Sequence, residues 1–273
     1  MAVPSEPVAS RKVSHGKGKW RTTRRWFLRS LLYGTPTLAL ADGLWIEPSW
    51  IATRRVRLST GTSKHRFVFI TDLHHKGDRE LLDSVVRRVN VLSPEFVCFG
   101  GDVVEEKEHV ADALDGLKQI KAPLYGVPGN HDYWSHADFG AIGEAFTATG
   151  GRWLMDEVIT TNDGKMQIAG ATCMNPIKFA LQDNLQRIAL IHYPLWVEKL
   201  NGYTFDAVLA GHSHGGQVRL PFIGPLITPF GVGQYDLGLF RTAAGPLYVG
   251  AGIGWFYLNV RFRCRPEITV VEI

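Results

Sequence analysis

The chain has 273 residues, of which 45% are hydrophobic and 21% charged, and its formal net charge is +4. This length suits one ordinary domain with a small appendage, and the composition excludes both a disordered tail and a bundle of membrane spans. Three cysteines exclude a disulfide framework. Residues 1–30 hold eight basic residues and one acidic residue, whereas residues 31–273 hold 22 basic and 25 acidic ones. The positive charge is thus N-terminal, and the mildly acidic remainder argues against a nucleic-acid partner.

The first 51 residues have the order of a bacterial export signal. Residues 1–29 are basic, are expected to be disordered, and contain the segment RRWFLR at 24–29. Paired arginines followed shortly by Phe-Leu and a basic residue resemble a twin-arginine signal. This resemblance implies the twin-arginine translocase as a partner and a protein exported across, or anchored to, the inner membrane. The alternative is a basic tail that binds phosphates.

Residues 30–51 are predicted to be a hydrophobic signal region or a membrane anchor. The uncharged run 30–41 is too short for an ordinary transmembrane helix but fits the apolar part of a signal. Residues 39–41, Ala-Leu-Ala, have the small-x-small form of a cleavage site. Because apolar residues continue to Ile51, an uncleaved membrane anchor stays an alternative to a cleaved signal.

From about residue 64 the sequence predicts alternating strands and helices. Apolar runs predict strands at 67–71, 96–99 and 123–127, and helical spacing predicts helices at 81–92, 110–117 and 139–146. Such alternation implies βαβ units and a parallel sheet. Right-handed crossovers then place the loops that follow the strands along one edge of that sheet.

The second half is richer in short strands. These are predicted at 153–155, 157–161, 166–171, 187–192, 207–210, 217–220, 247–250 and 267–273, with helices only at 179–186 and 194–200. The sequence has neither an internal repeat nor a low-complexity linker after residue 60. Residues 52–273 are therefore expected to form one domain of mixed α/β class.

Residue types that bind metals follow five of the predicted strands. They are Asp72, His74, Asp102, Asn130, His131, Asp132, His192, His212 and His214. Positions i and i+2 of an extended segment point the same way, so each Asp-x-His or His-x-His pair is expected to converge on one point. A single pair is more often a helix cap or a surface pair, but five such elements in order predict a metal site. The mixed oxygen and nitrogen set suits Mn²⁺, Fe or Zn²⁺, with Mg²⁺ as an alternative, and its size indicates two divalent ions.

This ordered set resembles the calcineurin-like metallophosphoesterase superfamily over about residues 66–273. The resemblance implies a four-layer αββα sandwich. It implies one metal bound by Asp72, His74, Asp102 and His214, and a second bound by Asp102, Asn130, His192 and His212. It also implies that His131 is not a ligand but faces the phosphoryl group and assists the leaving oxygen. Asp132 is expected either to orient His131 or to cap the following helix.

The implied reaction is hydrolysis of a phosphate or pyrophosphate ester, small or lipid-linked, by a hydroxide that bridges the two ions. The signal, the apolar segment 215–230 and residues 261–269 are similar to a bacterial branch of twin-arginine-exported or membrane-associated phosphodiesterases. Within that branch, Ser-Arg-Gly or Ser-Asn-Gly usually precedes the glycine-rich turn, and this chain has Gly-Ala-Gly at 250–252. The substrate of that branch therefore cannot be assigned to this chain directly.

Two other functions are consistent with parts of the sequence. A non-catalytic metal-binding interaction module on the same fold is opposed by the retention of His131 and of every ligand. A nuclease is opposed by the acidic body and the export signal. The aromatic residues Trp255, Phe256 and Tyr257 are expected in the core or at a membrane-facing lip, with a wall that binds a base or an acyl chain as the alternative. The sequence makes no prediction of oligomeric state.

Overall fold

The structure, a computed structural model, describes residues 24–58, 64–172, 174 and 177–273. Of the residues 1–29 that are predicted to be disordered, 1–23 lie outside the described residues, as does Cys173, whereas 24–29 form a helix, so the prediction is wrong for those six residues. The chain divides into two compact units, residues 1–39 and 40–273. Successive helical segments are α1 (Arg24–Arg29), η1 (Ser30–Gly34), α2 (Thr35–Ala41), η2 (Asp42–Ile46) and η3 (Glu47–Ser49). Among the described residues, none of the helices combines the length and apolar character that a membrane crossing requires.

The first sheet joins both ends of the unit 40–273. Its strand order is β1 (Ala52–Arg57), β14 (Glu267–Glu272), β2 (Arg66–Ile70), β3 (Val97–Phe99), β4 (Leu124–Gly126) and β5 (Arg152–Trp153). Strands β2 to β5 run parallel. The helices between them are α3 (Arg79–Leu92), η4 (Lys107–His109), α4 (Val110–Leu117), α5 (Asn130–Trp134) and α6 (Phe139–Ala148). This confirms the predicted βαβ units, whose strand ends share one edge of the sheet.

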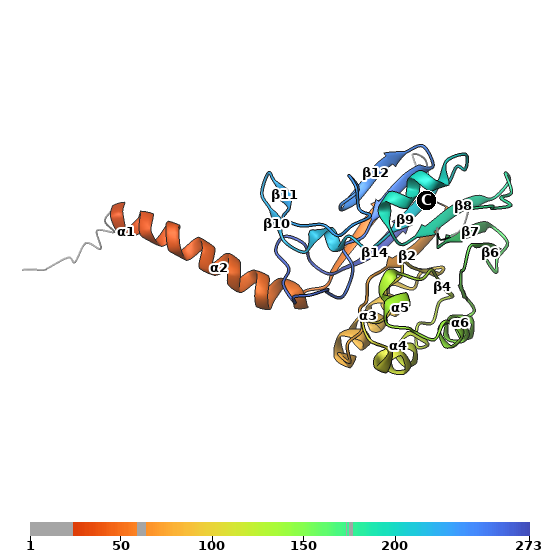
Figure 1. The fold of residues 1–273 in the computed structure, drawn as a ribbon, viewed down its shortest axis with the longest axis horizontal. Helices are drawn as coiled ribbons and strands as arrows, with labels where there is room; N and C mark the ends of the chain where they lie inside the picture. The colour runs from red at the N-terminus through yellow and green to blue at the C-terminus, as the bar shows by residue number, and fades with distance from the viewer. Residues whose placement is uncertain (1–23, 59–63, 173, 175–176) are drawn as a thin grey trace, which may run out of the picture. The chain divides into compact units, whose positions relative to one another are not determined.

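The second sheet has a parallel centre and antiparallel edges. Its order is β12 (Gly238–Thr242), β13 (Gly245–Val249), β9 (Ala207–Ala210), β8 (Gln186–Ile191), β7 (Met166–Ala171) and β6 (Glu157–Thr160). A separate hairpin consists of β10 (Arg219–Leu220) and β11 (Gly224–Pro225). Among the described residues of this half, the helices are the 3₁₀ segments η5 (Pro194–Leu200) and η6 (His214–Gly216). Figure 1 shows α3, α4 and α6 on one side and the second sheet on the other.

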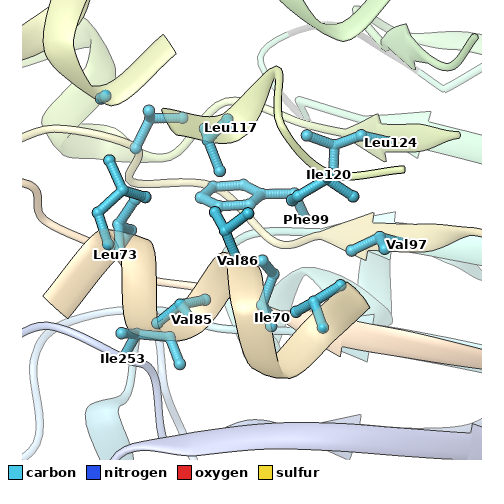
Figure 2. Packing of buried hydrophobic residues seen from close by; sticks show 14 of the residues in the cluster. Ile70, Leu73, Val85, Val86, Val97, Phe99, Leu117, Ile120, Leu124 and Ile253 are labelled. Carbon is cyan, nitrogen blue, oxygen red and sulfur yellow. The ribbon is translucent and has the colours of Figure 1, made fainter. Parts of the chain in front are cut away.

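The side chains of β2 point alternately to the two faces of the first sheet, which explains how the layers pack. Val68 and Ile70 face the helices, where they join a cluster with residues of α3, α4 and α6. Phe67 and Phe69 face the other way and pack against the second sheet. Successive strand residues point to opposite faces, so one short apolar run serves two cores. Figure 2 shows the helix-side cluster, in which Phe99 lies among side chains of α3 and α4.

The two sheets packed between outer layers confirm the predicted αββα sandwich of mixed α/β class. The outer layer on the second sheet consists of η5 and loops rather than long helices. The helix predicted at 179–186 is wrong. Phe179 is buried against that sheet, and the backbone of the segment donates to side chains, with Gln182 N bonded to Gln167 Oε1 at 2.7 Å. Its apolar residues therefore anchor a loop.

Candidate metal centre

The segments that follow five strands at one edge of the two sheets carry all seven predicted metal ligands. These strands are β2, β3, β4, β8 and β9, as predicted, and the ligands lie in loops except for Asn130 and His214, which begin α5 and η6. The ligands are Asp72 and His74, Asp102, Asn130, His192, and His212 and His214, and each is at most 7% exposed. Buried carboxylates and imidazoles need partners, since an isolated charge in a protein interior is costly. The structure therefore places every predicted ligand in one buried centre.

Asp102 lies in the middle of this centre. Its Oδ2 atom is 3.3 Å from His74 Nε2 and 3.2 Å from His192 Nε2. On one side, His214 Nε2 lies 3.0 Å from His74 Nε2 and 3.7 Å from Asp72 Oδ1. The Asp102 carboxylate thus contacts two histidines that the resemblance assigned to different ions.

The ligand atoms gather into two groups, each with the spacing that a shared ion produces. Asp72, His74 and His214 offer atoms within 4.8 Å of one another, and so do Asp102, His192 and His212. Bonds of about 2.1 Å to a common ion place neighbouring ligand atoms about 3.0–3.4 Å apart. The 3.0 Å between His74 Nε2 and His214 Nε2 in the first group, which allows a hydrogen bond when one nitrogen is protonated, also matches two ligands on one ion. These residues therefore fit a pair of divalent ions.

The second nitrogen of three of these rings has its own partner. His74 Nδ1 lies 2.6 Å from Glu105 Oε2, and His192 Nδ1 lies 2.8 Å from the carbonyl oxygen of Gly100. His212 Nε2 lies 2.7 Å from the carbonyl oxygen of Phe230. Such bonds fix the ring orientation and leave the other nitrogen free to bind an ion.

Five of the seven ligands have a left-handed backbone. The φ values are 53° at Asp72, 43° at His74, 60° at Asp102, 65° at His212 and 47° at His214. The premise that Asp-x-His and His-x-His lie on extended segments is therefore wrong, although each pair still converges. Residues other than glycine rarely adopt this conformation, at a cost on the order of 1–3 kcal/mol each. The surrounding fold must hold this strain, which is typical of functional sites.

Two opposing effects set the pKa values of the histidines in the centre, namely burial and the negative charge of neighbouring carboxylates. Burial lowers the pKa of His74, but its hydrogen bonds to Asp102 and Glu105 outweigh burial and raise that pKa to about 9. Burial also lowers the pKa of His192, but the charge of Asp102 and the hydrogen bond to it outweigh burial and raise that pKa to about 9. Burial and the neighbouring His192 lower the pKa of His212 to about 3. Because a ring nitrogen must lose its proton to bind a cation, ions that bind here displace protons.

His131 lies beside the ligand groups. Its ring centroid is 4.5 Å from that of His74, and its side chain is 18% exposed. Its Nδ1 atom lies 2.9 Å from Glu105 Oε2. The backbone N–H of His131 donates to Asp102 Oδ1 at 2.7 Å, which fixes the start of α5 against the centre. The ring is thus held in place while still reaching open space.

Asp132 caps α5 and does not pair with His131. Its buried carboxylate accepts from the backbone N–H of Gly129 at 2.9 Å, of Asp102 at 2.9 Å and of Val103 at 2.8 Å. Of the two roles expected for Asp132, the structure shows the cap. Its further effect is to tie the loop after β3 to the loop after β4.

The sequence reasoning missed Glu105, which is the partner of His131. One carboxylate oxygen, Oε2, contacts both His74 and His131. The available signal was an acidic residue three positions after Asp102, in the same loop. Because exposed loops often carry acidic residues, that signal alone does not identify a site residue.

Replacement of Glu105 by glutamine is expected to lower kcat for phosphoester hydrolysis about 10–100-fold. A neutral amide cannot provide one charged acceptor to both rings, so His131 would lose its fixed orientation. Steady-state kinetics with metal analysis provide the measurement. The matched control is Glu106→Gln, since the Glu106 side chain is 64% exposed. An unchanged kcat in the Glu105 variant would show that this contact is incidental.

Arg261 is a buried cation whose role the sequence did not indicate. It is 1% exposed, and its Nη1 donates to the carbonyl oxygens of Ala251 at 2.8 Å and Cys264 at 3.0 Å. Its Nη2 donates to the carbonyl oxygen of Gly252 at 3.3 Å. The loop that it holds lies on a predicted ligand, because Gly254 N donates to the carbonyl oxygen of Asp72 at 2.7 Å. Arg261 therefore holds the loop that contacts the main chain of Asp72.

The variant Arg261→Met is expected to lower the free energy of unfolding by about 3 kcal/mol or more, since it leaves several buried carbonyls without donors. Methionine keeps much of the length and volume of the side chain, so the loss reports mainly on the hydrogen bonds. Urea denaturation provides the measurement, and Arg263→Met, at an exposed position, is the control. Equal stability of the two variants would contradict this role.

A cavity of about 320 Å³ opens over the centre. Its floor is formed by His74, Asp102, Asn130, His131, His212 and His214, and its walls by Trp134, Tyr193, Ile227, Pro229, Phe230, Phe256 and Tyr257. A polar floor that binds cations beneath aromatic and aliphatic walls suits an ester with a phosphoryl group and a less polar substituent.

Known proteins are similar to this chain in sequence. The family model described as calcineurin-like phosphoesterase matches residues 65–216, more than half of the chain. Metallophosphoesterase YkuE of Bacillus subtilis is 30% identical over 283 residues, which cover 93% of this chain and 98% of that protein. Phosphodiesterase YaeI of Escherichia coli is 28% identical over 274 residues, which cover 92% of this chain and 99% of that protein. The chain therefore belongs to the calcineurin-like phosphoesterase family, and it is a metal-dependent phosphoester hydrolase.

Proposed function

We propose that this hydrolase is a dinuclear phosphodiesterase that cleaves a phosphate or pyrophosphate ester at the bacterial cell envelope. The position of Asp102 carries the proposal, because its Oδ2 lies 3.3 Å from His74 Nε2 and 3.2 Å from His192 Nε2. A carboxylate between two ligand groups suits a pair of divalent ions that share it. The name of the E. coli relative, a phosphodiesterase, supports a diester substrate.

Each ligand group has a distinct part in this proposal. Asp72, His74 and His214 would hold one ion with Asp102, and Asn130, His192 and His212 would hold the other. Asn130 belongs to the second group because its Oδ1 lies 3.0 Å from His192 Nε2. When bound, two divalent ions lower the pKa of a coordinated water and offset charge on the phosphoryl oxygens. The mixed donor set suits Mn²⁺, Fe or Zn²⁺ and also admits Mg²⁺.

His131 would act on the leaving oxygen. Its Nδ1 is held by Glu105, which leaves Nε2 to reach a substrate in the cavity. An imidazolium paired with a carboxylate can donate a hydrogen bond or a proton to a departing alkoxide. Glu105 would keep the ring in that orientation and stabilise its charge, whereas Asp132 would hold the two loops together.

The envelope location rests on the N-terminal sequence. The arginine pair at 24–25 and the uncharged run 30–41 support recognition by the twin-arginine translocase. The double change Arg24→Lys with Arg25→Lys tests it, and the full chain should then stay inside cells of a bacterial host. Equal export of the unchanged and changed chains would reject this route while leaving the chemistry intact.

Turnover of bis-p-nitrophenyl phosphate by the full chain with Mn²⁺, compared with p-nitrophenyl phosphate, tests the chemistry. The proposal expects turnover that EDTA abolishes and Mn²⁺ restores, with the diester preferred. Absence of EDTA-sensitive turnover on both compounds would reject the enzymatic proposal in favour of a metal-binding module. Faster turnover of the monoester would reject the diesterase assignment alone.

A further inference from the structure

An exposed apolar surface, here termed the apolar rim, adjoins the cavity over the metal centre. It comprises Phe222, Ile223, Leu226, Ile227, Phe230, Tyr257 and Leu258. The relative exposure is 109% at Phe222, 91% at Phe230 and 88% at Tyr257. The segment 220–235 contains no Asp, Glu, Lys or Arg residue. Scattered exposed apolar residues are ordinary, but a contiguous uncharged group of this kind marks an interaction site.

The apolar rim is continuous with the catalytic cavity. Ile227, Phe230 and Tyr257 line that cavity together with the predicted ligands. The main chain of Phe230 is also tied to the centre, because its carbonyl oxygen lies 2.7 Å from His212 Nε2. The opening to the metal centre and the apolar rim therefore adjoin each other.

Packing within the chain does not account for the tip of this surface. Phe222 lies in the turn of the β10–β11 hairpin with a φ of 67°. A bulky residue in this conformation is strained. Its side chain remains fully exposed, so it gains no burial within the chain that would offset the strain. Figure 1 shows this hairpin standing out from the two sheets.

We propose that the apolar rim docks on a lipid bilayer and that the enzyme takes an amphiphilic phosphoester from it. A convex, uncharged hairpin tip can enter acyl chains without the matching shape that a protein partner would need. Tyr257 combines an apolar ring with a polar hydroxyl, which suits the bilayer interface. The choice of substrate class rests on the proposed phosphodiesterase function, whereas the docking does not.

Charge at the base of the hairpin supports a lipid partner. Val218 pairs with Phe262, which places Arg263 beside the hairpin. Arg263 is exposed, and it forms no ion pair with any carboxylate in the described part of the chain. A free guanidinium next to an uncharged apolar tip matches anionic headgroups next to acyl chains.

An environment-sensitive fluorophore on the full chain tests the docking. It is attached through Phe222→Cys in a Cys173→Ser background, because Cys98 and Cys264 are buried. The control is Val91→Cys, since Val91 is an apolar residue of α3 that is 83% exposed. With vesicles of phosphatidylcholine and phosphatidylglycerol, emission from position 222 should shift to the blue and resist aqueous iodide, while emission from position 91 should not change.

Three results would overturn the docking. In the first, position 222 stays in water although the chain sediments with vesicles, which places another segment in the bilayer. In the second, both positions shift equally, which indicates unspecific adsorption. In the third, position 222 is shielded without lipid in a concentration-dependent way, which indicates a second copy of the chain.

The double variant Phe222→Ser with Ile223→Ser tests delivery of the substrate, because neither residue lines the cavity. Hydrolysis of hexadecyl p-nitrophenyl phosphate in vesicles should fall at least about tenfold, since two large apolar contacts are lost. Hydrolysis of soluble bis-p-nitrophenyl phosphate should not change. Equal rates on the vesicle ester, or no hydrolysis of it by the unchanged chain, would reject the amphiphilic substrate. Absence of soluble turnover would instead reject the phosphodiesterase function, and the fluorescence result would stand.

Discussion

Replacement of His131 by alanine is expected to lower kcat for bis-p-nitrophenyl phosphate by roughly 10²–10⁴, the usual contribution of a general acid. The bound metal should not change, because the His131 ring lies outside both of the ligand groups assigned to ions. The loss should grow as the leaving group becomes more basic, since a poor leaving group depends more on a donated proton. Phenyl esters and dialkyl esters would extend the series, because their leaving groups are progressively more basic than p-nitrophenolate.

The matched control for this variant is His136→Ala. His136 is a second histidine five positions further along the chain, and it is exposed. It should retain the kcat of the unchanged chain. Full activity of the His131 variant on esters with basic leaving groups would contradict the assigned role. Loss of metal together with activity would instead make His131 a ligand.

Replacement of Asp102 by asparagine is expected to affect both ions at once. The variant should lose at least one ion per chain, and kcat should fall by more than the roughly 10–100-fold typical of residues that only support ligands. The reason is geometric, because Oδ2 contacts His74 and His192 while Oδ1 accepts from the backbone N–H of His131. A neutral amide removes the charge that balances two cations.

Metal analysis by mass spectrometry and steady-state kinetics on the same sample would measure this effect. The control is Asp183→Asn, because the Asp183 side chain is 100% exposed. Retention of two ions by the Asp102 variant would show that this carboxylate is not shared. Loss of folding, detected by circular dichroism, would be answered with the variant Asp102→Glu, which keeps the charge but displaces it.

The ligand set could be predicted because each member follows a short apolar run. Parallel strands bring their carboxyl ends to one edge, so the topology alone places Asp72, Asp102 and Asn130 together. The left-handed backbone at Asp72 could not be predicted, since it is stabilised by tertiary contacts such as that of Gly254 N with its carbonyl oxygen. The side chains of each pair thus converge as predicted, but from a left-handed backbone rather than an extended one.

Residues that act through contacts with other side chains are harder to recognise in the sequence. Glu105 contacts His131 only because two loops, 26 residues apart in sequence, lie side by side, and spacing does not reveal that approach. Arg261 looks like an ordinary basic residue until its burial among carbonyl oxygens is known. Strand β1 was not predicted, because it is mostly polar and lacks an apolar run. Its pairing with β14 at the edge of the sheet makes it a strand. These features depend on contacts between distant residues, which one sequence does not record.

Turnover of bis-p-nitrophenyl phosphate as a function of Mn²⁺ bound per chain tests the central claim most directly. The apo full chain is titrated with Mn²⁺, and bound metal and kcat are measured at each step. If the two ligand groups that meet at Asp102 act as one dinuclear centre, turnover should reach its maximum at two ions per chain. A maximum reached at one ion, or no turnover at any metal content, would contradict the account.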